Sequence, residues 1–389
     1  MIALVLLLAW QPFAFAGKAT STDDLEKGLD HLLGFVASEQ SAEGLDRSVV
    51  DDVLQYVEQS PEMAQYTPRE RDGVRGAFLS YAVERPLDEV VRYAYNRRIP
   101  EGASNPSSIH FARWTSINGA SDDALPDIWP LLTSLEQPTV IRGVSRETIA
   151  PDLHTGAYYA YDLQRAIVLL QDGSRRAVIS LSNQIGHSDV GRKGVIVGDD
   201  KDWNYLYTEA QGVNKAGLGW VKSRIYQFLS VCIYIEDQAS PGIVKMGVFQ
   251  WLGAGWAGFN MVDTHHIQKG LERYAVQFKA MMTADEMPEP QALEALYDVL
   301  HQSDEGLLRK TAYDVTRHIH GLAKKGDSAR ERRTADDVDP RTYVDGLDRE
   351  ELVTVIMREY VKHRLGKGSP LASAFWVAIK ANGERPKPL

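Results

Sequence analysis

The sequence contains a single cysteine, Cys232, among its 389 residues. One thiol excludes an intramolecular disulfide and any zinc or iron–sulfur site built on several cysteines. Lysine and arginine total 43 against 53 aspartate and glutamate residues, which gives a net charge of −10. A chain of this charge has no overall positive field, so nucleic acid is not expected as its main partner.

Several stronger signals are absent as well. The chain has no H-E-x-x-H, no G-x-S-x-G, no phosphate-binding P-loop and no dinucleotide-binding glycine motif at the start of a helix. We therefore expect no metal site and no cofactor. Beyond the N-terminus, no window approaches the roughly 20 apolar residues of a bilayer-spanning helix, so no transmembrane span is expected in the mature chain. The composition, with 44% apolar and 25% charged residues, is that of an ordinary globular protein.

The first segment of the chain indicates export. Ile2 to Trp10 are uninterrupted apolar residues, and Ala14-Phe15-Ala16 has the small-x-small pattern of a signal-peptidase site. We predict a signal peptide over residues 1–16, cleavage near Gly17, and a periplasmic or secreted mature protein. No lysine or arginine precedes the apolar run, which leaves the true translation start open. A buried first helix and a membrane anchor are the alternatives, although Gln11-Pro12 interrupts the run too early for a span.

Residues 17–100 are predicted to form an N-terminal helical region of three helices. Apolar residues recur at helical spacing over 25–36 and again over 49–57. The third predicted helix begins at Thr67-Pro68-Arg69-Glu70, which has the pattern of a capping box with proline at the first helical position. Its apolar face would comprise Val74, Ala77, Phe78, Tyr81 and Ala82.

Residues 101–283 are predicted to form a central α+β domain. Two β-type runs flank Asp172-Gly173, one of the strongest short hairpin signals, and further strands are expected over 194–198, 203–208, 223–236 and 243–252. Because short turns join these strands, the sheet should be antiparallel. A long helix over 264–282, capped by Asp263, should cover the sheet.

Residues 284–389 are predicted to be a C-terminal helical region. Its last long helix should start at Asp348 with Glu351 in the capping-box position, and residues 324–340 should be a mobile charged linker because they contain almost no large apolar residue. An antiparallel sheet followed by one long helix is loosely compatible with helix-grip ligand-binding folds. That resemblance is one of topology alone and implies no function.

Aromatic residues are concentrated between residues 155 and 260, which suggests either core filling or an apolar ligand cavity between sheet and helix. For the cavity we predict four aromatic walls and one polar anchor. They are Trp203, Trp220, Trp256 and Phe259 as the walls and Arg192 as the anchor.

Three residues are candidates for acid–base catalysis. His187 and Asp189 flank one serine in a predicted loop, and His265 lies at the start of the long helix. The simpler interpretations are a solvated hairpin loop for the first pair and an ordinary helix N-terminus for His265.

These observations lead to one preferred function and two alternatives. We expect an exported protein whose central domain binds an apolar or amphipathic small molecule. The first alternative is a hydrolase that uses His187 or His265 with a carboxylate. The second is an envelope assembly protein whose helical ends, residues 284–389 above all, contact a protein partner.

Overall fold

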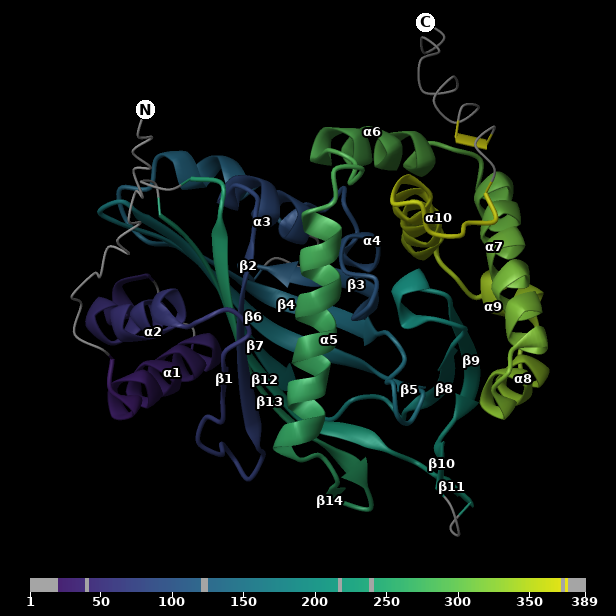
Figure 1. The fold of residues 1–389 in the computed structure, drawn as a ribbon, viewed down its shortest axis with the longest axis horizontal. Helices are drawn as coiled ribbons and strands as arrows, with labels where there is room; N and C mark the ends of the chain where they lie inside the picture. The colour runs from purple at the N-terminus through teal and green to yellow at the C-terminus, as the bar shows by residue number, and fades with distance from the viewer. Residues whose placement is uncertain are drawn as a thin grey trace, which may run out of the picture.

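A large antiparallel sheet forms the centre of the protein in the computed structural model. The structure describes residues 20–38, 42–119, 125–215, 219–237, 241–371 and 375–376. The predicted signal peptide, residues 1–16, lies outside the described residues. The sheet has nine strands, and Figure 1 shows it behind the long helix α5. Its order is β1 (Gln65–Tyr66), β2 (Gly76–Val83), β13 (Val244–Trp256), β12 (Arg224–Asp237), β7 (Arg175–Ile185), β6 (Ala160–Asp172), β4 (Thr139–Ile149) and β3 (Ile109–Ile117), with β14 (Phe259–Asn260) paired to β13.

Helices cover both faces of this sheet. On one face α1 (Thr22–Ala37) and α2 (Arg47–Gln59) pack on aliphatic residues of the central strands. On the other face lie α5 (Thr264–Met282), α3 (Leu87–Tyr95) and the short α4 (Glu101–Ser104). The predicted α+β class with an antiparallel sheet and one long covering helix is therefore confirmed. Asp263 caps α5 as expected, because its side chain accepts a hydrogen bond from the His266 backbone N–H.

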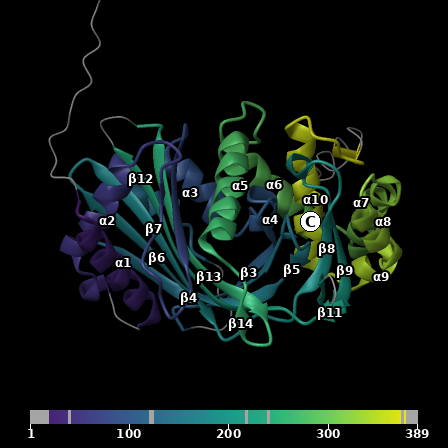
Figure 2. The same ribbon diagram turned by 60° about the horizontal axis from the view of Figure 1, so that its bottom comes forward.

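The C-terminal helices form a separate layer beside α5. They are α6 (Pro290–His301), α7 (Glu305–Lys325), α8 (Ala329–Asp336), α9 (Pro340–Asp345) and α10 (Arg349–Arg364). A small sheet of β5 (Ala157–Tyr158), β8 (Arg192–Ile196) and β9 (Tyr205–Gln211) joins this layer to the main sheet, and β10 (Val213–Lys215) pairs with β11 (Gly219–Val221) nearby. In Figure 2 the layer lies across from α1 and α2, with α5 between them.

The third predicted N-terminal helix is wrong. Residues 76–83 form β2, which pairs with β13 over its whole length. The strand is buried on both faces: Leu79 and Tyr81 join the core under α5, and Phe78 joins the core under α2. An apolar run buried on two faces shows no clear period of two, so the sequence alone could not separate strand from helix.

The predicted mobile linker over residues 324–340 is also wrong. Residues 329–336 of this segment form α8, and the side chain of its capping residue, Ser328, accepts a hydrogen bond from the Arg330 backbone N–H. Polar contacts hold the helix in place: Arg330 donates to the His154 carbonyl oxygen at 2.8 Å, and the His320 Nε2 of α7 lies 2.9 Å from the Ala335 carbonyl oxygen. The lack of large apolar residues was therefore misleading, because the helix docks through these polar contacts and through two small buried residues, Thr334 and Ala335.

Candidate ligand-binding cavity

A cavity of about 310 Å³ lies between the main sheet and α5. Strands β4, β6, β7, β12 and β13 supply its floor, α5 supplies its roof, and α4 with the following loop supplies one wall. Much of the lining is apolar, and the larger aliphatic side chains and phenylalanines are Ile109, Ile149, Leu163, Ile225, Phe228, Val248, Leu252, Leu271 and Phe278. The volume falls at the lower end of the range for ligand pockets.

The cavity face of the sheet has a row of polar side chains. Arg165 of β6 lies opposite Ser182 of β7, Ser182 opposite Ser230 of β12, and Ser230 opposite Gln250 of β13. Residues paired across strands point to the same face, so the four side chains form one polar row across the floor. The side chains of Ser182 and Gln250 have no hydrogen-bond partner among the described residues, which leaves them available to a ligand.

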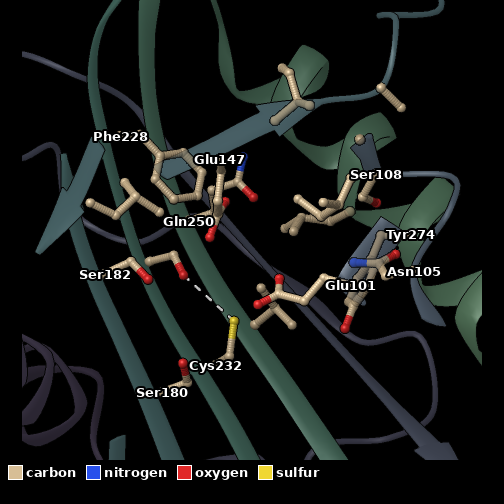
Figure 3. A pocket seen from close by; sticks show the side chains of 18 of the residues that line it. Glu101, Asn105, Ser108, Glu147, Ser180, Ser182, Phe228, Cys232, Gln250 and Tyr274 are labelled. Atoms are coloured by element: carbon tan, nitrogen blue, oxygen red, sulfur yellow. Dashed lines mark hydrogen bonds between the residues drawn. The ribbon is translucent and has the colours of Figure 1, made fainter. Parts of the chain in front are cut away.

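One guanidinium and two carboxylates lie at the end of this row. Arg165 donates a hydrogen bond to Glu147 at 3.0 Å, and its Nη1 lies 3.5 Å from a carboxylate oxygen of Glu101. Arg165 is 8% exposed and Glu147 6%, so the ion pair is buried. The Nε of Arg165 has no partner, and its guanidinium lies 5.3 Å from the centre of the Trp114 ring. Figure 3 shows Glu101 and Glu147 pointing into the same space from opposite sides.

Burial shifts the pKa values of these three charged side chains. Loss of solvent raises the pKa of Glu147 to about 7, although the adjacent Arg165 opposes the shift. The pKa of Glu101 is raised for the same reason, and the two carboxylates raise the pKa of Arg165 against its own burial. The low-dielectric surroundings thus favour a neutral carboxyl, while Arg165 stays charged.

Cys232 lies on the floor next to the polar row. Its Sγ is 3.5 Å from the Ser230 hydroxyl, the contact drawn as a dashed line in Figure 3. Burial raises the pKa of the Cys232 thiol. A reactive cysteine needs a lowered pKa, so this thiol serves as a small cavity wall rather than as a nucleophile.

The wall that presents Glu101 is held by the C-terminal layer. Arg358 of α10 donates to the carbonyl oxygens of Gly102 and His110, each at 2.8 Å. A Cβ at position 102 would lie 2.2 Å from the His110 carbonyl oxygen, so the close approach of α4 and β3 requires glycine there. Residues about 250 positions apart therefore place one of the two cavity carboxylates.

A second cation, Arg273 of α5, also lines the cavity, but its charge is neutralised. Its guanidinium makes two hydrogen bonds to the Asp200 carboxylate, at 2.6 and 2.7 Å, and lies 3.3 Å from the Tyr205 hydroxyl. The amide of Gln277 donates to the same carboxylate. This network ties α5 to the small sheet and fixes the roof of the cavity.

Three of the four residues predicted as cavity walls lie elsewhere. Trp203 is buried beside α5, where its ring N–H donates to Gln277 at 2.7 Å. Trp256 and Phe259 face each other across the β13–β14 hairpin, and Phe259 is 65% exposed. The predicted anchor Arg192 forms an ion pair with Glu209 at 3.1 Å. None of these four lines the cavity, and the side chain of Trp220 lies outside the described ones.

The structure does not bring the predicted catalytic residues together. His187 is exposed and lies against the Tyr226 ring, while Asp189 forms an ion pair with Arg146 at 2.5 Å. His265 is exposed at the start of α5. Across the described ranges, neither imidazole has a hydrogen bond to a carboxylate, so the orienting contact that a general base uses is missing from both.

The described part of the chain offers neither a metal site nor a membrane-spanning helix. It contains no group of three histidine, cysteine or acidic side chains placed to hold a metal ion. No helix within those residues is both long enough and apolar enough to cross a membrane.

None of the predicted site residues whose side chains the structure describes lines the cavity, and the residues that do line it were not predicted. Their signal is a polar side chain at a position of a strand whose same-face neighbours are apolar, as with Arg165 between Leu163 and Ile167, or a repeated serine, as with Ser180 and Ser182. The strands were recognised, but the inward face could not be identified until their partners were known.

Comparisons with known proteins add little to this description. No protein-family model matches the chain, and no curated protein matches it in sequence. Among solved structures, the human StarD13 (DLC2) lipid transfer and protein localization domain aligns with 62% of this chain and 98% of its own length, at 12% identity and a TM-score of 0.27. A likeness this weak supports no conclusion about ligand or activity.

Proposed function

We propose that this protein binds a small amphipathic molecule in the cavity between the main sheet and α5. The observation that carries the proposal is the combination of an apolar lining with polar groups that have no hydrogen-bond partner among the described residues. These groups are the buried Nε of Arg165 and the side chains of Ser182 and the half-buried Gln250. Buried polar groups are almost always paired in native proteins, so unpaired ones facing a cavity indicate a ligand or water that completes them.

The volume limits the size of the ligand. An apolar cavity of about 150 Å³ accommodates benzene, so a cavity of about 310 Å³ suits a molecule of roughly a dozen non-hydrogen atoms. A chain of about ten carbons with one polar group meets this limit. A membrane phospholipid with two full acyl chains does not.

Native mass spectrometry of gently purified protein tests the proposal, together with calorimetric titration of medium-chain amphiphiles. We expect either a co-purified organic mass or saturable binding at one site. Ser182→Phe should fill the cavity and abolish this binding, whereas Ser134→Phe on an exposed loop should leave it unchanged. Unchanged binding by a folded Ser182→Phe protein would place the ligand elsewhere and overturn the proposal.

We also propose that the mature protein is exported. The support is the apolar N-terminal run followed by Ala14-Phe15-Ala16. Intact-mass measurement of protein from fractionated cells tests this. A periplasmic or secreted form that lacks residues 1–16 is expected, and a full-length form that stays in the cytoplasm would contradict it.

A further inference from the structure

The charges around the cavity restrict the polar group of its ligand. Of the residues that line the cavity, only Arg165 and Arg273 carry a positive charge at neutral pH. Arg273 is bound to Asp200 by two hydrogen bonds, and Arg165 contacts both Glu147 and Glu101. An anionic headgroup would therefore find the charge of both guanidiniums already balanced by carboxylates, with the Nε of Arg165 as the guanidinium donor that both carboxylates leave unused.

The carboxylates of Glu101 and Glu147, in contrast, make few hydrogen bonds to the protein. Among the described residues, the Glu101 carboxylate has one polar contact, with Arg165 at 3.5 Å, which is long for a charge-assisted hydrogen bond. Two carboxylates compete for one guanidinium, so the cluster carries an excess of negative charge when both are ionised. A hydrogen-bond donor in the cavity would satisfy the free oxygen atoms, and a positive charge would also balance the excess.

The remaining polar groups of the cavity agree with a small donor group. Ser182, Ser230 and Gln250 extend from Arg165 across the floor and accept or donate hydrogen bonds without adding charge. Asp152, the other acidic residue of the lining, is bound to the backbone N–H groups of His154 and Thr155 at the rim. Nothing along this path supplies the free cation that a carboxylate or phosphate would require.

We propose that the ligand presents a hydrogen-bond donor, an amine or a hydroxyl group, to Glu101 and Glu147, and that molecules with an acidic headgroup are rejected. This inference rests on the proposed function, and it assigns the chemical class of ligand to the same cavity. Glu101 and Glu147 are then the residues that determine specificity, and Arg165 keeps the two carboxylates in place.

Three molecules with the same chain isolate the effect of the headgroup. Decylamine, decanol and decanoic acid should be titrated into the wild-type protein at about pH 8, where the amine is charged and the acid is ionised. We expect the amine to bind tightest, the alcohol next, and the acid at least about tenfold more weakly than the amine. Equal or tighter binding of the acid would overturn the inference while leaving the proposed function intact. Absence of binding by all three would overturn both.

Two conservative variants test the assigned residues. Glu147→Gln releases Arg165 from its closest carboxylate and should raise affinity for the acid while lowering affinity for the amine. Glu101 is partly exposed, so Glu101→Gln removes no fully buried ion pair. Like Glu147→Gln, this variant should lower the affinity for the amine. Glu209→Gln, at an exposed position outside the cavity, is the matched control and should change nothing. A loss of affinity that is equal for all three molecules would indicate a merely structural role and overturn the assignment.

Discussion

The two faces of the main sheet differ in a way that separates stability from binding. Toward α1 and α2, strand β12 presents Leu229, Val231, Ile233 and Ile235, and the layer they enter is a buried apolar core of aliphatic and aromatic side chains. Toward α5, the same strand presents Phe228, Ser230, Cys232 and Tyr234 to a cavity. Because side chains alternate along a strand, one run of residues builds a dry core on one side and a partly polar pocket on the other. Burial on the first face stabilises the sheet, so the second face can tolerate unfilled space.

Removal of Arg165 should have the largest effect on the cavity face. Arg165→Leu leaves Glu147 buried without its partner, and we expect the free energy of unfolding to fall by about 4 kcal/mol. Denaturant titration followed by tryptophan fluorescence measures this loss. The double variant Arg165→Leu/Glu147→Leu should recover most of it, since no buried pair is then broken. A double variant as unstable as the single one would show that packing, not charge, explains the loss.

The pH dependence of stability should also distinguish the two faces. Burial raises the pKa of Glu147 from 4.5 to about 7, so the folded protein binds a proton that the unfolded chain releases. The contribution of the Glu147 carboxyl to the free energy of unfolding is fully present below about pH 4.5. It is lost as the pH rises through 7, by up to about 3 kcal/mol. The measurement is the difference in unfolding free energy between wild type and Glu147→Gln at several pH values.

That difference should favour the wild type at the acidic end and decline toward neutral pH. The comparison with the variant removes the contributions of exposed ion pairs, which titrate alike in both proteins. A difference that stays constant from pH 4.5 to 7 would mean that Glu147 keeps an ordinary pKa.

The smallest effect on stability is expected from two valine-to-alanine substitutions, one on each face of the sheet. They compare the packing of the two faces directly. Val231 is fully buried under α1 and α2, and Val248 is 5% exposed on the cavity floor. Val231→Ala removes contacts on a closely packed face and should cost about 2 kcal/mol, whereas Val248→Ala enlarges space that already exists and should cost about 1 kcal/mol. Thermal and denaturant unfolding of both variants gives the two values. Equal losses would indicate that the cavity face is as well packed as the other.

Local signals in the sequence predicted many of the elements. The Asp172-Gly173 turn lies between β6 and β7, and its glycine has a φ of 56°, a left-handed conformation that glycine adopts without strain. The capping residues Asp263 and Asp348 start α5 and α10 as expected. Both signals depend on neighbours within a few residues, which is why they can be identified without the fold.

Long-range contacts account for the failures. Thr67-Pro68-Arg69-Glu70 has the pattern of a helix start, yet the Arg69 backbone N–H donates to the buried Glu26 and its carbonyl oxygen accepts from the Trp251 ring. Those partners come from α1 and β13, which no local pattern reveals. The charged segment that became α8 was mistaken for a linker for the same reason.

The sequence by itself determined the α+β class, the antiparallel pairing and the two faces of β12, because alternation, turn residues and helix caps act over short distances. Only the tertiary structure decided which face is a cavity and which residues line it. Glu101, Glu147 and Arg165 come from a short helix and two strands, and α10 holds the first of them in place. Their proximity results from packing between distant segments, and the burial that shifts their pKa values exists only once those segments meet.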